Sequence, residues 1–167
     1  MNISKNVSYL YSCFWLLVPI LVFNLIYAHQ LPAAFQMEIF WKDIPKQISL
    51  PENILRGFVM VLPVFMRLRV STPGQKLGLR LYLAGLLLYF ASWAVLIVLP
   101  QCAWSMSAVG FLAPAYTPIV WLAGIGMIGN ELLFAKIPIK PWIYWTLSTM
   151  FLIFHNWHTA TVYFRND

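Results

Sequence analysis

Long apolar stretches alternate along the chain with short polar segments, many of which contain proline. A helix that crosses the hydrocarbon core of a bilayer needs about 20 predominantly apolar residues. Five stretches approach this length and predict transmembrane helices at residues 9–28, 50–69, 73–99, 118–135 and 141–164. The pattern therefore predicts an all-α protein, a polytopic integral membrane helix bundle whose single domain comprises residues 1–167.

The first stretch, residues 9–28, contains no charged residue. A cleaved signal peptide is the alternative interpretation, but the apolar part of such a peptide usually spans only about 7–15 residues. We therefore expect a helix that remains in the protein. Asn24 lies inside this helix, and we expect its side chain to hydrogen-bond to a neighbouring helix rather than to a ligand.

Capping patterns mark the expected starts of the second and third helices. Ser49 is followed three residues later by Glu52, and Thr72 is followed three residues later by Gln75. Both pairs match the capping box, in which the two side chains bond to each other's backbone N–H groups. The connection around residues 70–72 is so short that the two helices are expected to form an antiparallel hairpin.

The second stretch differs from the others because charged residues occur within it. Only residues 57–66 are free of charge, and Arg56 would have to extend to the membrane surface or find a partner. The alternative architecture therefore has four transmembrane helices and one interfacial helix.

Two connections are too apolar to be ordinary loops and too short to span. Residues 30–47 mix aromatic and charged side chains, as interfacial segments do. Residues 101–116 are uncharged and are interrupted by proline and glycine. We expect residues 30–47 to lie in the interface, with a short amphipathic helix that stops before Pro45. We expect residues 101–116 to lie in the interface or to fold over the ends of the helices.

Small residues recur on one face of the fourth helix, at Ala123, Gly126 and Gly129. Such a stripe lets another helix approach closely, within the chain or from a partner. The same region, residues 124–129, matches GxGxxG, but no strand precedes it and a nucleotide site is not indicated.

Composition and charge agree with a membrane location. Hydrophobic residues make up 61% of the chain and charged residues only 10%, whereas soluble domains are typically about a quarter charged. The net charge of +6 does not indicate a nucleic-acid partner, because no basic run with interleaved aromatic residues is present. When residues 70–72 are placed in the cytoplasm, the whole net charge falls on that side, as the positive-inside bias predicts. We expect the cell membrane, a cytoplasmic N-terminus and an external C-terminus.

The two cysteines, Cys13 and Cys102, belong to no CxxC motif. The expected topology places them near opposite faces of the membrane, too far apart for a disulfide. This disfavours a thiol–disulfide oxidoreductase.

The candidate site gathers polar residues that the topology brings to the outer face. His155 and His158 share a face of the fifth helix. Ionisable groups inside a membrane segment usually have a function or a partner. Arg56 needs an anion so close to hydrocarbon, and either Glu52 or an acidic group of a ligand would provide one. The candidate ligand-binding residues are His29, Glu52, Arg56, Trp104, Tyr116, His155 and His158.

Three function classes remain open. The leading hypothesis is a protein that binds or carries an apolar or amphipathic small molecule, such as a lipid, an isoprenoid or a quinone. The alternatives are a membrane enzyme that uses the histidines on a lipid or isoprenoid substrate, and an assembly subunit without chemistry of its own. A histidine pair can also hold a metal or a haem, but HxxH alone is a weak signal, and the sequence names neither a metal nor a cofactor. No catalytic residue is assigned.

Overall fold

The computed structural model describes residues 9–133 and 140–166, and the structure is 80% helical, with no strand in this part of the chain. Five longer helices form the body: α2 (Val18–Tyr27), α4 (Lys46–Phe65), α5 (Pro73–Val98), α9 (Pro118–Ile128) and α10 (Pro141–Asn166). Short turns of helix connect them: η1 (Tyr9–Tyr11), η2 (Cys13–Leu16), η3 (Ala28–Gln30), η4 (Ala33–Phe35), α3 (Met37–Phe40), α6 (Ala103–Met106), α7 (Ala108–Phe111) and α8 (Ala113–Tyr116).

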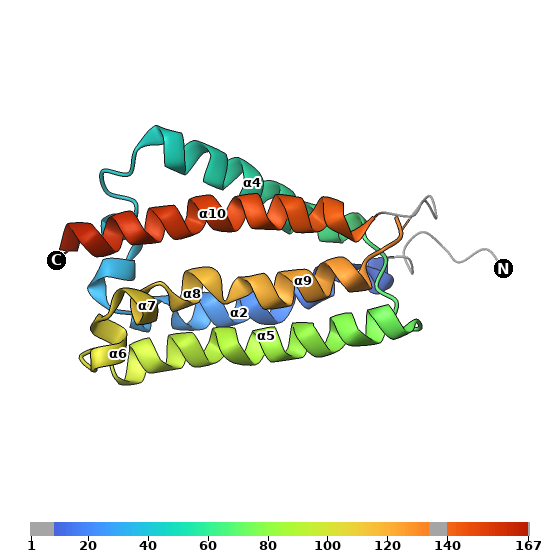
Figure 1. The fold of residues 1–167 in the computed structure, drawn as a ribbon, viewed down its shortest axis with the longest axis horizontal. Coiled ribbons are helices and arrows are strands. Elements are labelled where there is room, and N and C mark those ends of the chain that lie inside the picture. The colour runs from blue at the N-terminus through green and yellow to red at the C-terminus, as the bar shows by residue number, and fades with distance from the viewer. Residues whose placement is uncertain (1–8, 134–139, 167) are drawn as a thin grey trace.

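The long helices run side by side as a bundle (Figure 1). Helix α9 packs against both α5 and α10, and α4 packs against α10. The connection from α4 to α5 lies at one end of the bundle, whereas α6, α7 and the end of α10 lie at the other (Figure 1). This is the arrangement of ends that the sequence predicted.

Three helical segments are long and apolar enough to cross a membrane: Cys13–Gln30, Lys46–Phe65 and Pro73–Val98. This is fewer than the five expected. The helical stretch Ala113–Ile128 is apolar but short. Helix α10 has 26 residues, but polar side chains around His155 lower its mean hydropathy. By length and composition, the structure thus supports a membrane location on three of the five expected spans.

Helix α4 begins earlier than expected, directly after Pro45, and the capping box of Ser49 with Glu52 does not form. Glu52 instead lies in the second turn with its side chain buried. The helix also ends at Phe65, before Arg69, because Met66 is extended and pairs with Leu132. The capping box at Thr72 and Gln75 is confirmed.

The fourth expected helix is shorter than predicted. It ends at Ile128. The backbone carbonyl of Glu131 then accepts a hydrogen bond from the backbone N–H of Arg67 (2.8 Å), so residues 131–133 run beside the segment that follows α4. The end of the expected range, residues 134–135, lies outside the described residues. Thr117 does not cap the helix, because its hydroxyl donates to the Ala113 carbonyl (2.8 Å).

Tyrosine hydroxyls tie neighbouring helices together at buried carbonyls. Pro63 has no N–H group to donate to the carbonyl of Val59, and the Tyr144 hydroxyl of α10 donates to that oxygen instead (3.2 Å). The Tyr89 hydroxyl of α5 donates to Asn24 Oδ1 (2.8 Å). The expected interhelical hydrogen bond of Asn24 is thereby confirmed.

Glycines allow the closest helix contacts. A Cβ atom on Gly85 of α5 would lie 2.8 Å from Trp121 Cα, and one on Gly124 would lie 2.6 Å from the Tyr82 backbone nitrogen. Gly126 faces the Trp145 ring of α10 in the same way, and Gly129 faces Met66 and Cys13. The small-residue stripe therefore packs inside the chain, which leaves the expectation of an external helix partner as a prediction only.

Candidate functional site

The centre of the site is Glu52, whose side chain is 0% exposed on the face of α4 that meets α10. Arg56 lies four residues further along the same helix face, and its guanidinium bonds to Glu52 Oε1. The two histidines of α10 approach the same carboxylate. His155 Nδ1 lies 2.9 Å from Glu52 Oε1, and His158 Nδ1 lies 2.6 Å from Glu52 Oε2. One buried carboxylate thus holds three basic side chains.

Phe40 of α3 provides the fourth partner of this cluster. His158 Nε2 donates to the Phe40 carbonyl oxygen (2.9 Å), and the two rings are in contact, with centroids 4.2 Å apart and planes tilted by 32°. Arg165, at the end of α10, donates to the Ile39 carbonyl (2.7 Å) and to the Lys42 carbonyl. The segment around α3 is therefore fixed to α10 at two points.

These contacts determine how many protons the Glu52–His158 pair carries. A carbonyl oxygen can only accept, so His158 Nε2 must hold a hydrogen. Nδ1 and Glu52 Oε2, only 2.6 Å apart, would then present two lone pairs to each other unless a second proton lies between them. The pair is either imidazolium with carboxylate or imidazole with carboxylic acid, and its net charge is zero in both cases.

Arg56 lies partly outside the carboxylate cluster, with its side chain 33% exposed. Its guanidinium lies 5.3 Å from the centroid of the Trp41 ring and 5.7 Å from that of Phe151. Contacts of this kind favour a cation at the edge of an aromatic cage.

A cleft of about 430 Å³ opens beside the cluster. Its volume lies within the range of about 300–1,000 Å³ that is typical of small-molecule sites. Residues from α2, α4, α5, α9 and α10 line it, and Arg56, His155 and Thr159 contribute polar atoms on one side. Most of the remaining wall is apolar, as the lining residues Ile20, Leu31, Phe35, Met60 and Phe151 show.

Two tryptophans also line the cleft, Trp93 of α5 and Trp121 of α9. Trp121 is 3% exposed, and within the described residues its indole nitrogen has no hydrogen-bond partner. Trp93 lies edge-on to Tyr89, with ring centroids 5.8 Å apart. A buried N–H group without an acceptor costs free energy.

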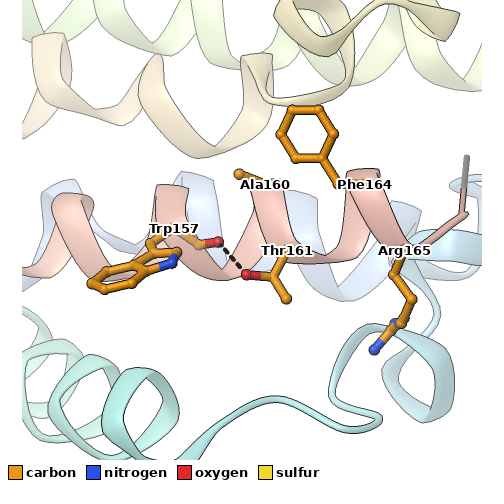
Figure 2. Close-up of a pocket in the computed structure, with 5 residues that line it drawn as sticks. All are labelled: Trp157, Ala160, Thr161, Phe164 and Arg165. Atoms are coloured by element: carbon orange, nitrogen blue, oxygen red, sulfur yellow. Dashed lines mark hydrogen bonds between the residues drawn. The ribbon is translucent and has the colours of Figure 1, made fainter.

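A larger hollow of about 520 Å³ lies on the outside of α10 and is lined only by residues of that helix (Figure 2). Trp157 and Phe164 are 58% and 71% exposed, and the Thr161 hydroxyl donates to the Trp157 carbonyl of its own helix (2.9 Å). This hollow is therefore the exposed face of a single helix. The central cleft, where several helices and the polar cluster meet, is the better candidate site.

The structure places the seven expected site residues in two groups. Glu52, Arg56 and the two histidines of α10 are in contact with one another. The other three line no part of the cleft. His29 is exposed at the end of the first helix, Trp104 is 47% exposed on α6, and the Tyr116 hydroxyl donates to the Val109 carbonyl within the same connection (3.2 Å). These three residues lie toward the same end of the bundle as the Glu52 cluster, but they are not part of the cluster.

Sequence reasoning missed Phe40, Trp93 and Trp121. A backbone carbonyl such as that of Phe40 leaves no signal in a sequence, since every residue has one. The tryptophans occur in a chain with eight tryptophans, and nothing in their spacing marks these two.

Metal binding has little geometric support. Among residues 9–133 and 140–166, no group of three or more histidine, cysteine or acidic side chains is arranged to hold a metal ion. The Nδ1 atoms of both histidines face Glu52, and His158 Nε2 bonds to the Phe40 carbonyl. Of the four ring nitrogens, His155 Nε2 alone is left as a metal ligand.

No protein-family model matches the chain, and comparisons with curated proteins and with solved structures found no match.

Proposed function

We propose that this protein is a multi-pass membrane protein that binds an apolar or amphipathic small molecule, a lipid, an isoprenoid or a quinone, in the central cleft. The observation that carries the proposal is the cleft itself, whose walls are largely apolar and which the polar side chains of Arg56, His155 and Thr159 also line. A few polar groups in an apolar cavity are what a small-molecule site requires.

The proposed topology keeps five crossings. Helix α9 packs against α5, and α10 packs against α4, and both α4 and α5 are long and apolar enough to span. The stretch Ala113–Ile128 has about 16 residues, or roughly 24 Å of helix at 1.5 Å per residue. A helix of this length reaches most of the way across a hydrocarbon core of about 30 Å. It can therefore cross the membrane beside α5, against which it packs. The membrane is proposed to be the cell membrane, with the N-terminus in the cytoplasm and the C-terminus outside.

The fluorescence of Trp93 and Trp121 allows a direct test. The purified full-length protein in detergent micelles is titrated with decylubiquinone and with the methyl ester and the free acid of 9,10-dibromostearic acid, all of which quench tryptophan at short range. We expect at least one probe to quench saturably.

Two variants separate the cleft from the micelle. Ala28 lines the cleft at an exposed position, and Ala33 is exposed but does not line it. Ala28→Phe is expected to weaken saturable quenching at least fivefold, and Ala33→Phe is expected to leave it unchanged. Quenching that rises linearly with every probe, to the same extent in both variants, would mean partition into the micelle and would reject the proposal.

A second candidate function is a membrane enzyme that acts on a lipid or isoprenoid substrate. The observation in its favour is His155, whose Nδ1 is held by Glu52 while its ring lines the cleft. A carboxylate that orients an imidazole in this way is a common arrangement for general acid–base catalysis. Mass spectrometry of a bound probe after incubation separates the two functions, because an enzyme converts the probe and His155→Ala then binds without converting it.

A further inference from the structure

The charge balance of the polar cluster points to the chemical class of the ligand, and this inference rests on the proposed function. Glu52 has a single negative charge, and three basic side chains contact it. The proton count above leaves the Glu52–His158 pair neutral wherever the shared proton resides. The charge of Arg56 is therefore not balanced within the cluster, although Arg56 touches the carboxylate.

His155 cannot supply the missing negative charge. With Nδ1 donating to Glu52 Oε1, its ring is neutral if Nε2 is bare and cationic if Nε2 carries a hydrogen. The net charge of Glu52, Arg56, His155 and His158 is therefore at least +1.

Within the part of the chain that the structure describes, no acidic group other than Glu52 pairs with Arg56. Within residues 9–133 and 140–166, the ion pairs of carboxylates are those of Glu52 with the cluster and of Glu131 with Arg67 (3.6 Å). Glu38 and Asp43, the acidic residues of the segment that packs over the cluster, are exposed. Arg56 also donates to the neutral amide oxygen of Asn53 (3.4 Å) and contacts two aromatic faces, and neither interaction adds negative charge.

A net cation beside an apolar cleft in the membrane is costly without a counter-ion. We infer that the ligand carries a carboxylate headgroup, which binds at Arg56 and His155 while its apolar chain occupies the cleft. A carboxylate provides the one negative charge that the cluster lacks, and the planar guanidinium pairs well with its two oxygens.

The test compares two probes with the same apolar chain, one with a charged carboxylate and one with a neutral methyl ester. The wild-type protein in uncharged detergent is titrated at pH 8 with 9,10-dibromostearate and with its methyl ester, and tryptophan quenching is followed. We expect the free acid to bind at least tenfold more tightly than the ester. Equal affinities, or tighter binding of the ester, would overturn the inference.

Variants locate the effect at Arg56. Arg56→Gln is expected to remove the preference for the acid over the ester, and Arg56→Lys, which keeps the charge, is expected to retain part of it. A preference that survives in Arg56→Gln would overturn the assignment of the headgroup to this residue. Because the wild-type comparison needs no substitution, misfolding of a variant does not prevent the test.

The outcome also separates this inference from the proposed function. If the acid and the ester both bind saturably and equally, and Ala28→Phe weakens both, the cleft binds a ligand but the carboxylate is wrong. If neither these probes nor decylubiquinone binds saturably, the proposed function itself fails. Dodecyl phosphate extends the comparison to a second anion, and tighter binding of dodecyl phosphate than of dodecanoate would show that the headgroup is a phosphate and not a carboxylate.

Discussion

Glu52 shows how much one residue depends on its surroundings. In the sequence it stands three residues after Ser49, which indicates a helix cap, and four residues before Arg56, which indicates an ion pair. In the structure the histidines of α10 and Arg56 occupy both carboxylate oxygens. The oxygens are thus already bonded, and the helix begins at Lys46 without a side-chain cap. Local spacing could not decide between the two roles, because α10, which comes about a hundred residues later, makes the difference.

The same contacts predict a large loss of stability in Glu52→Ala. Removing a buried carboxylate leaves His158 and Arg56 without their shared partner, and breaking a buried charged pair costs about 3–5 kcal/mol. We expect the free energy of unfolding in mixed micelles to fall by about this amount. Glu38→Ala, at an exposed position of α3, should change it by less than about 0.5 kcal/mol. Similar values for the two variants would show that the cluster does not stabilise the fold.

At the scale of helices, the lengths of the apolar stretches and the prolines between them predicted the bundle, whereas several boundaries depended on tertiary contacts. The start of α5 was correct because its capping box involves only Thr72 and Gln75, which are neighbours in sequence. The end of α9 was wrong because residues 131–133 pair with the segment after α4. Apolar residues continue past Ile128, and only that pairing separates helix from extended chain.

Of the site residues, the four that contact one another (Glu52, Arg56, His155 and His158) could be identified from the sequence, because unpaired charges are rare in apolar segments. Trp121 could not be identified, since most tryptophans in such chains only pack against other side chains.

Two glycines, Gly85 on α5 and Gly57 on α4, give a matched test of helix packing. A Cβ atom on Gly85 would collide with the backbone of Trp121, which cannot move without shifting α9, whereas one on Gly57 meets nothing within 4 Å. We expect Gly85→Ala to lower the free energy of unfolding by about 1–3 kcal/mol through overpacking. Gly57→Ala, in the middle of α4, should raise it by about 0.5–1 kcal/mol through helix propensity. Chemical denaturation in mixed micelles measures both, and a Gly85→Ala variant as stable as the wild type would mean that α5 and α9 are further apart than the structure shows.

At the scale of the whole molecule, the distribution of charge along the bundle predicts its orientation. Arg67, Arg69, Lys76 and Arg80 lie at or near the connection from α4 to α5, which occupies one end of the bundle, whereas α6 and the end of α10 occupy the other (Figure 1). Positively charged residues near the ends of spans favour the cytoplasm. The two natural cysteines make this testable with little change to the protein, because Cys13 is 0% exposed and Cys102 is partly exposed at the end with α6.

Cys102 is expected to react with a membrane-impermeant maleimide added to intact cells. Two groups of Ser105 hydrogen-bond to its sulfur, the side-chain hydroxyl (3.3 Å) and the backbone N–H (3.4 Å). These bonds, the hydroxyl's first, lower the pKa of the Cys102 thiol. A lower pKa increases the fraction of reactive thiolate near neutral pH. Cys102→Ser should abolish labelling of the intact cells, since Cys13 is buried. In a Cys102→Ser background, a cysteine introduced by Thr72→Cys should be labelled only in inside-out vesicles. If Thr72→Cys is labelled in intact cells and Cys102 is protected there, the orientation is the reverse of the one proposed. The positive-inside bias would then not govern this bundle.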